Sequence, residues 1–118
     1  MILKRNPENL RQLEKCHGGS GLLWCSEILA DYQKKESGFA FIHDNVIEPN
    51  ASIGELTHAG DEEIYLILSG HEVMRVDGVD HAVGEGDVCL TRCGHSHSLQ
   101  NSSEGPMHFL VINTKINP

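Results

Sequence analysis

Basic side chains are scarce in this sequence. Nine Lys and Arg residues stand against seventeen Asp and Glu residues, which gives a formal net charge of −8 at pH 7 with the histidines neutral. Nucleic acids and anionic membrane surfaces both favour clustered basic side chains. The charge balance therefore argues against nucleic acid and against a membrane surface as partners.

Long hydrophobic runs are also missing. No apolar stretch among the 118 residues approaches the roughly 20 residues that a membrane-spanning helix needs. The first residues, from Met1 to Pro7, are too polar and have too short an apolar core for a secretory signal. We therefore expect a cytoplasmic protein, and the chain length fits one domain.

The cysteines lack the Cys-x-x-Cys spacing of a zinc knuckle. There are four of them: Cys16, Cys25, Cys89 and Cys93. An even number permits disulfides in a secreted protein, but without a signal segment we expect reduced thiols. A zinc cluster of Cys89, Cys93, His95 and His97 is an alternative. Strand geometry disfavours it, because alternate side chains point to opposite faces.

Short apolar stretches separated by turn residues recur along the chain. Strands are predicted at residues 22–30, 39–47, 53–57, 63–68, 71–76, 81–83, 87–91, 97–100 and 108–113. Asp77-Gly78 predicts a tight hairpin, because these residue types tolerate positive φ. Residues 31–38 are polar and predict a loop. Many short strands at this spacing indicate an all-β sandwich or barrel.

The N-terminal part is less regular. Residues 7–15 predict a short helical turn, with Asn6 as its cap. The strand at 22–30 could be partly helical instead. We expect residues 1–37 to form an N-terminal extension and first strand that pack on a barrel made by residues 38–118.

A histidine and a carboxylate lie on neighbouring predicted strands. His58 precedes a Gly-Asp turn signal and Glu63 follows it, so a tight turn would bring the two side chains together. Only one of Glu62 and Glu63 can enter the barrel, because adjacent strand residues face opposite sides. Imidazole and carboxylate groups bind Zn, Mn, Fe and Ni ions. A second histidine cluster, His95-Ser-His97, follows a glycine-bounded strand, so the two segments predict a metal pocket.

These segments resemble the two motifs of the cupin family, in its small single-domain, conserved-barrel (cupin 2) form. The end of the first motif is matched by His58, Glu63 and Gly70. The marked positions of the second motif are matched by Gly86, Gly94, His97 and Asn101. Three positions depart from the motifs: Leu56 replaces the first histidine, Asn50 the leading glycine and Arg92 the proline.

The resemblance implies a double-stranded β-helix, or jelly-roll barrel, with a short N-terminal extension and a divalent metal ion (Zn, Mn, Fe or Ni) inside. It places the metal ligands at His58, Glu63 and His97. Because Leu56 cannot bind a metal, the set becomes two histidines and one carboxylate, as at non-haem iron sites. His95 could supply a third imidazole, since it lies two residues before His97.

Other polar side chains are predicted near this pocket. Tyr65 shares the face of Glu63 by the two-residue period of a strand. Arg75 is predicted to reach the pocket from the next strand, where it would hold a carboxylate or phosphate. The remaining histidines are expected to be structural or exposed: His17, His43, His71, His81 and His108.

The resemblance does not determine the reaction, because the family includes isomerases, dioxygenases, decarboxylases, sugar-binding regulators and storage proteins. Small members are often described as mannose-6-phosphate-isomerase-like. One hypothesis is a metal-dependent enzyme acting on a small organic acid or sugar derivative. The alternative, which Leu56 favours, is a non-catalytic small-molecule-binding or sensor protein with a weakened or absent metal site. We also expect a homodimer, because several apolar residues offer interface surface: Leu22, Leu23, Trp24, Phe39 and Phe41.

Overall fold

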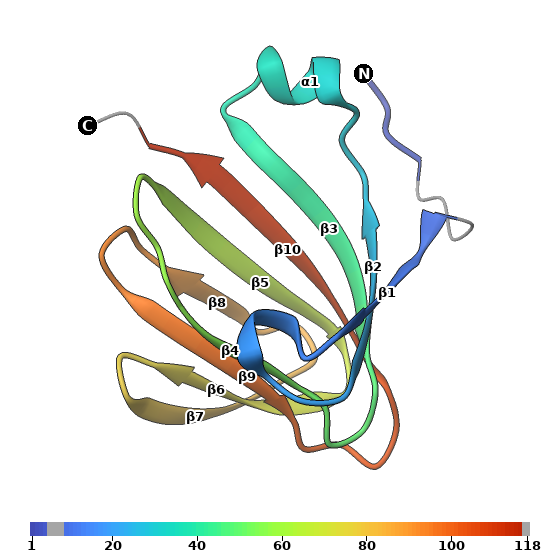
Figure 1. Ribbon diagram of the computed structural model, residues 1–118, viewed down its shortest axis with the longest axis vertical. Coiled ribbons are helices and arrows are strands. Elements are labelled where there is room, and N and C mark those ends of the chain that lie inside the picture. The colour runs from blue at the N-terminus through green and yellow to red at the C-terminus, as the bar shows by residue number, and fades with distance from the viewer. Residues whose placement is uncertain (5–8, 117–118) are drawn as a thin grey trace.

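The computed structural model describes residues 1–4 and 9–116, and it consists of two antiparallel β-sheets (Figure 1). The larger sheet has the strand order β1-β2-β3-β10-β5-β8, and the smaller has the order β4-β9-β6-β7. The strands are β1 (Arg11–Glu14), β2 (Leu22–Glu27), β3 (Phe39–Ile47), β4 (Ser52–Thr57), β5 (Asp61–Ser69), β6 (His71–Val76), β7 (Val79–Gly84), β8 (Val88–Thr91), β9 (Ser96–Asn101) and β10 (Met107–Lys115). The structure also contains the short helix α1 (Asp31–Lys35) and the 3-10 turn η2 (Cys16–Gly18). The predicted all-β, double-sheet fold is confirmed.

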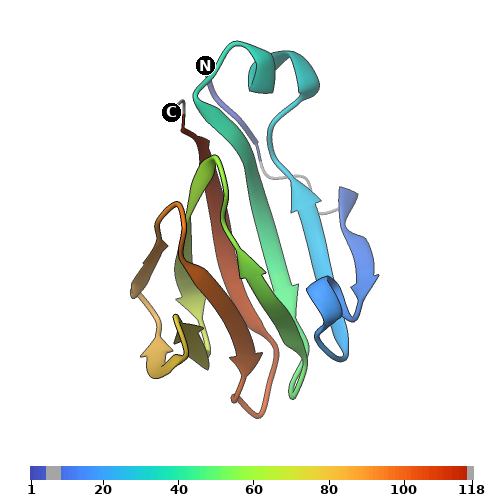
Figure 2. The same ribbon diagram turned by 60° about the vertical axis from the view of Figure 1, so that its left-hand side comes forward.

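The hydrophobic core lies between the two sheets, which face each other in Figure 2. Buried and half-exposed residues alternate along β5 and β10, as expected of strands that pack through one face. The largest fully buried apolar side chains come from both sheets: Ile47, Ile67, Met74, Met107 and Phe109. Among the described residues, 1–4 and 9–116, no helix is long and apolar enough to cross a membrane.

The hairpin predicted at Asp77-Gly78 is confirmed. These residues connect β6 to β7 with φ angles of 49° and 81°, the positive values that a tight two-residue hairpin turn requires. Strands β3 and β6 also begin and end at the predicted residues. Local sequence signals are therefore sufficient where a strand is bounded by strong turn residues.

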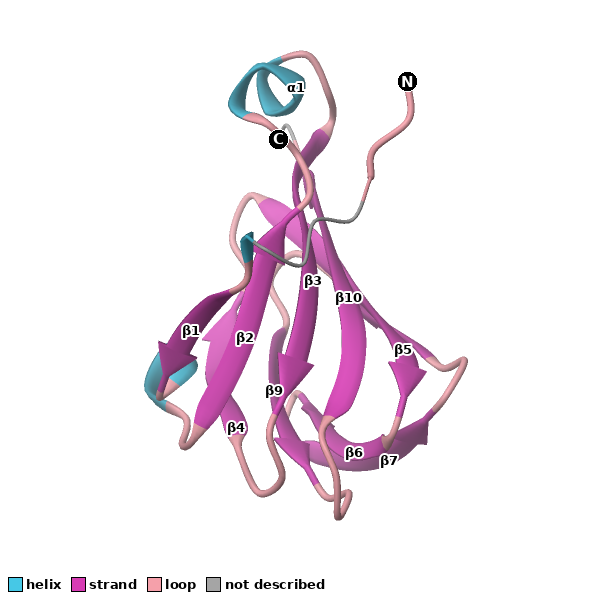
Figure 3. Ribbon diagram, turned by 90° about the vertical axis from the view of Figure 1, so that its right-hand side faces the viewer, coloured by secondary structure: helices cyan, strands magenta, loops and turns pink. Residues whose placement is uncertain are grey.

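The N-terminal part differs from the prediction. Arg11–Glu14 forms β1, which pairs with β2 and extends the larger sheet beyond β3 (Figure 3). The helical turn predicted over residues 7–15 is wrong there, because pairing with β2 satisfies the backbone and overrides local helix signals. Residues 6–8 of that prediction lie outside the described residues. The loop predicted at 31–38 contains the short helix α1. The division of the chain at residue 38 stays a prediction.

The turn η2 packs closely against β4 and closes one side of the interior. A Cβ atom on Gly54 would lie 1.9 Å from the His17 carbonyl oxygen, and one on Gly19 would lie 2.2 Å from the Ser52 carbonyl oxygen. Both positions therefore require glycine, because any larger residue would push the two segments apart. This contact positions η2, which carries the half-buried Cys16 and the exposed His17.

The residues expected at a dimer interface do not all face outward. Leu23 is buried in the core, and Phe41 packs against that core from a half-buried position. Phe39 is 42% exposed, but larger exposed fractions occur on the edge strand β8, where Val88 is 60% and Leu90 is 50% exposed. Exposed apolar side chains therefore occur on β8 as well as in the N-terminal half.

A carboxyl group is buried in the core without a partner. Glu72 on β6 is 1% exposed, and neither of its side-chain oxygens has a hydrogen-bond partner among the described residues. It lies opposite Asn101 of β9 and close enough to Tyr65 and Cys89 to influence their ionisation. Burial raises the pKa of Glu72 from 4.5 to about 8. The carboxyl therefore enters the core as the neutral acid.

This burial predicts that the fold loses stability as the pH rises from about 5 to 9. Above pH 4.5 the unfolded chain releases the Glu72 proton while the folded chain keeps it up to about pH 8, so the free energy of unfolding falls with pH. Each pKa unit of difference corresponds to about 1.4 kcal/mol. We expect Glu72→Gln to flatten this decline in thermal midpoints measured by circular dichroism. The exposed-site variant Glu85→Gln should keep the wild-type slope, and a wild-type slope in Glu72→Gln would contradict the prediction.

Candidate metal centre

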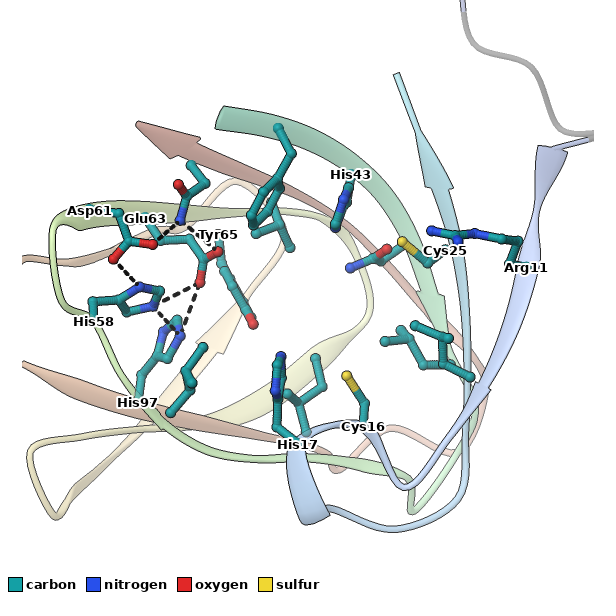
Figure 4. A pocket seen from close by; sticks show the side chains of 18 residues that line it. Arg11, Cys16, His17, Cys25, His43, His58, Asp61, Glu63, Tyr65 and His97 are labelled. Atoms are coloured by element: carbon teal, nitrogen blue, oxygen red, sulfur yellow. Dashed lines mark hydrogen bonds and ion pairs between the residues drawn. The ribbon is translucent and has the colours of Figure 1, made fainter. Parts of the chain in front are cut away.

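The interior contains a cavity of about 290 Å³ (Figure 4). Its wall is formed by η2 and by residues of strands β1 to β5, β9 and β10, and it is mainly apolar with a few polar groups. A cavity of this size and composition is typical of small-molecule sites. Figure 4 shows His58, Glu63 and His97 together on one side of the cavity, with Cys25 and Arg11 on the opposite side.

Three buried side chains meet on the first side. Nε2 of His58 and Nε2 of His97 each lie 3.0 Å from Oε2 of Glu63, and the two nitrogens lie 2.9 Å apart. All three residues are at most 5% exposed. Within the described residues, they are the one group of three His, Cys, Asp or Glu side chains close enough to hold an ion together. The structure thus brings the three predicted ligands together.

Two backbone hydrogen bonds bring the histidines to the same place from distant parts of the chain. The His58 N–H donates to the His95 carbonyl at 3.0 Å, and the Gly94 N–H donates to the His58 carbonyl at 2.8 Å. Strand β9 then pairs with β4 so that His97 lies opposite Leu56. Both imidazoles therefore enter the cavity side by side.

Neighbouring polar groups orient His58 and Glu63. The Nδ1 atom of His58 lies 3.0 Å from Oδ1 of Asp61. Because a carboxylate only accepts, the neutral ring donates through Nδ1 and directs the lone pair of Nε2 into the cavity. The Asn113 amide donates to Oδ2 of Asp61 at 2.9 Å and to Oε1 of Glu63 at 3.4 Å. Asn113 thereby links Asp61, which orients His58, to Glu63.

The three donors fit a divalent metal ion. Nδ1 of His97 lies 2.9 Å from the Thr91 hydroxyl, which can accept its proton and leave the Nε2 lone pair free. Bonds of about 2.1 Å at right angles place neighbouring donor atoms about 3.0 Å apart. The observed separations of 2.9 and 3.0 Å match one face of an octahedron. The residues present therefore match a two-histidine, one-carboxylate metal site.

Leu56 lies in the cavity wall near this face and contributes no donor atom. It is half-buried on β4, directly across the strand pair from His97. A fourth protein ligand is therefore missing from this side. An ion held by the three side chains would keep coordination positions for water or a small ligand.

Tyr65 lies in the cavity, as its spacing from Glu63 predicts. It is 5% exposed, and its ring centroid lies 5.0 Å from that of His97 and 5.2 Å from that of Phe109. Burial, and then the nearby charge of Glu63, raises the pKa of its phenol. The hydroxyl therefore keeps its proton and serves as a hydrogen-bond donor in the cavity wall.

His95 lies outside the cavity, which corrects the expectation that it could add a third imidazole. Its side chain is 52% exposed, and Nδ1 lies 2.5 Å from Oδ2 of Asp77. The turn at Gly94, with φ of 87°, directs it away from His97. The alternative zinc cluster does not form either, because Cys89 is buried in the core while Cys93 is exposed.

Arg75 also points away from the cavity. Strand β6 buries Glu72 and Met74, so the two-residue period turns Arg75 outward. Its side chain is 53% exposed and lies 3.5 Å from Asp80. The expectation that it reaches the pocket is wrong, because the register of β6 gives the inward positions to its neighbours.

The side of the cavity opposite the cluster was missed by sequence reasoning. It includes Arg11 from β1, His17 from η2, Cys25 from β2 and His43 from β3 (Figure 4). His17 and His43 were expected to be structural or exposed. His17 is exposed and His43 is half-buried, and both also line the cavity. The pairing of β1 with β2 and of β2 with β3 brings Arg11, Cys25 and His43 to the cavity, and the contact of η2 with β4 brings His17 there. For Asp61, by contrast, the three-residue spacing from His58 is a usable local signal.

The cavity thiols are protonated at neutral pH. Burial raises the pKa of Cys25 to about 11, although the Arg11 guanidinium opposes the rise. Burial, reinforced by the charge of Glu63, also raises the pKa of Cys16. Neither thiol is therefore a nucleophile in the resting protein.

Comparisons with known proteins agree with this fold. The Cupin domain family matches residues 45–113. An oxalate-binding protein of Thermotoga maritima is 29% identical over 112 residues, which cover 95% of this chain and 92% of that protein. The crystal structure of a predicted oxalate decarboxylase from Thermotoga maritima has a TM-score of 0.91 at 27% identity, covering 98% of this chain and 100% of that chain. A Cupin 2 conserved barrel domain protein from Salinispora arenicola shares the fold, with a TM-score of 0.76, 20% identity and coverage of 98% and 89%.

Proposed function

The chain belongs to the cupin domain family, and on that basis we propose that it holds a divalent metal ion through His58, Glu63 and His97. The observation that carries the proposal is the meeting of two ring nitrogens and one carboxylate oxygen within 3.0 Å of one another. Asp61 and Thr91 support it, because each orients one histidine through its Nδ1 atom.

We propose that the ligand in the cavity is a small organic acid. When bound, a divalent ion supplies positive charge and open coordination positions that suit a carboxylate. Tyr65 adds a protonated hydroxyl to the same cavity. The relative named as an oxalate-binding protein also supports an organic acid ligand. Reversible binding of such an acid is the function that the site supports best.

A metal-dependent enzyme acting on a small organic acid or a sugar derivative is the second candidate. The three-donor ligand set favours it, because coordination positions remain for a substrate and for a second reactant. The similar structure described as a predicted oxalate decarboxylase points the same way. The protonated thiols and phenol in the wall favour binding instead, because they can donate hydrogen bonds but cannot act as bases at neutral pH.

The metal proposal predicts that His97→Ala loses bound ion. Two remaining ligands compete poorly with water, so metal content measured by elemental analysis should fall at least tenfold. His81→Ala is the matched control, because His81 is an exposed residue of β7 outside the cavity. Leu56→His should tighten binding by adding an imidazole to the same side of the cavity. Equal metal content in the wild-type protein and all three variants would contradict the proposal.

The ligand proposal predicts that carboxylates bind to metal-loaded protein and not to protein treated with a chelator. Calorimetric titration with oxalate before and after metal removal checks this. Oxalate incubated with the loaded protein is then analysed for carbon dioxide and formate. Binding without product supports the ligand-binding function, product formation supports the enzyme, and equal oxalate affinity with and without metal would contradict both.

We also propose that two copies pair through the outer face of the larger sheet. Leu90 on β8, Ile64 on β5 and Ile112 on β10 lie side by side in register and form an apolar row. Sedimentation should therefore show a dimer at micromolar concentration. Leu90→Lys should shift it to monomer, whereas Val79→Lys, at a 57% exposed position on β7, should not. A wild-type protein that sediments as a monomer would refute this.

A further inference from the structure

We propose that the cavity takes a dicarboxylate with several carbon atoms between its two acid groups. One carboxylate lies at the His58, Glu63 and His97 cluster, and the other is held by Arg11 at the opposite side. The position of the first carboxylate rests on the proposed function. The position of the second rests on the size of the cavity, the chemistry of its wall and the position of the Arg11 guanidinium.

The cavity is larger than the smallest dicarboxylate requires. A volume of about 290 Å³ corresponds to roughly ten water-sized groups at about 30 Å³ each. Oxalate has six non-hydrogen atoms and would leave a large part of this space unfilled. Apolar side chains line much of the wall: Leu13, Leu23, Phe41, Ile53, Leu56 and Val111. Such a wall suits the methylene groups of a longer acid, because their burial is favourable at about 0.8 kcal/mol per group.

A permanent positive charge, that of Arg11, lies at the side of the cavity opposite His58, Glu63 and His97 (Figure 4). Arg11 is the one Lys or Arg among the lining residues that the structure describes. Figure 4 shows its side chain running from β1 toward the cavity, with the guanidinium beside Cys25. Burial is the main cause of two pKa shifts here: it raises the pKa of Cys25 and lowers the pKa of His43. The charge of Arg11 lowers both pKa values, so it opposes the first shift and adds to the second. His43 is therefore uncharged, and Arg11 supplies the cation at this side.

An acidic side chain near Arg11, Glu27, is already engaged. Arg11 and Glu27 border the same shallow surface hollow. Oε1 of Glu27 lies 2.5 Å from Nζ of Lys34 and 3.6 Å from Nε2 of His43. Within the described residues, no ion pair involves Arg11. The guanidinium is thus available for a ligand carboxylate, which it can bind through two parallel hydrogen bonds.

The test is a calorimetric titration of Mn²⁺-loaded protein, repeated with Zn²⁺. The ligands are oxalate, malonate, succinate, glutarate and adipate, with valerate as the monocarboxylate that matches glutarate in chain length. We expect an acid longer than oxalate to bind most tightly. Arg11→Gln should weaken glutarate binding at least tenfold and change valerate binding less than twofold. The glutarate affinity of Arg11→Lys should lie between those of wild type and Arg11→Gln. Lysine keeps the positive charge but cannot form two parallel hydrogen bonds with one carboxylate.

The matched control is Arg75→Gln, which removes an exposed arginine outside the cavity and should leave every affinity unchanged. Thermal melting verifies that Arg11→Gln is folded. The inference is overturned if oxalate binds more tightly than every longer acid, or if Arg11→Gln weakens valerate as much as glutarate. In both cases metal-dependent oxalate binding would still uphold the proposed function. Failure of every carboxylate to bind the loaded protein would instead overturn the proposed function as well.

Discussion

The register of β5 controls how the site is assembled. This strand pairs with β10 on one side and β8 on the other, so Glu63 lies between Asn113 and Thr91. A slip of one residue would turn Glu63 outward and bring Glu62 inside, because successive side chains point to opposite faces. It would also remove the amide of Asn113 from the carboxylate. Backbone pairing, more than any single side-chain contact, therefore selects the ligand set.

The interior holds two carboxyl groups in different ways. Glu63 accepts a hydrogen bond from the Asn113 amide, and its Oε2 faces the two ring nitrogens with which it would share a metal ion. Glu72 has no hydrogen-bond partner among the described residues, and its raised pKa makes it a neutral acid in the core. A buried ion needs partners, whereas a neutral carboxyl costs less to bury. Of the two, Glu63 alone is arranged to bind a cation, and Glu72 instead makes the fold sensitive to high pH.

The sequence predicts the parts of this structure that depend on short-range patterns. Alternating apolar residues and turn pairs such as Asp77-Gly78 give most strands. The spacing of His58 and Glu63 gives two members of the cluster, and the resemblance to the cupin motifs adds His97. The errors arise where the pairing and register of strands decide the outcome. Arg11–Glu14 becomes a strand only because β2 offers an unpaired edge, and Arg75 points outward because of the register of β6. Neither fact is encoded in a local motif.

The two sides of the cavity come from different parts of the chain. The matched family region, residues 45–113, contributes the cluster of His58, Glu63 and His97. Strands β1 and β2 and the turn η2 lie before that region, yet they form the side that includes Arg11 and Cys25. The close contact between η2 and β4 at Gly54 fixes the two parts to one another. Changes in the N-terminal strands can therefore alter which ligand fits while leaving the ligand atoms of the cluster in place. In the arrangement that we propose, the residues that would hold the ion are separate from the residues that would select the acid.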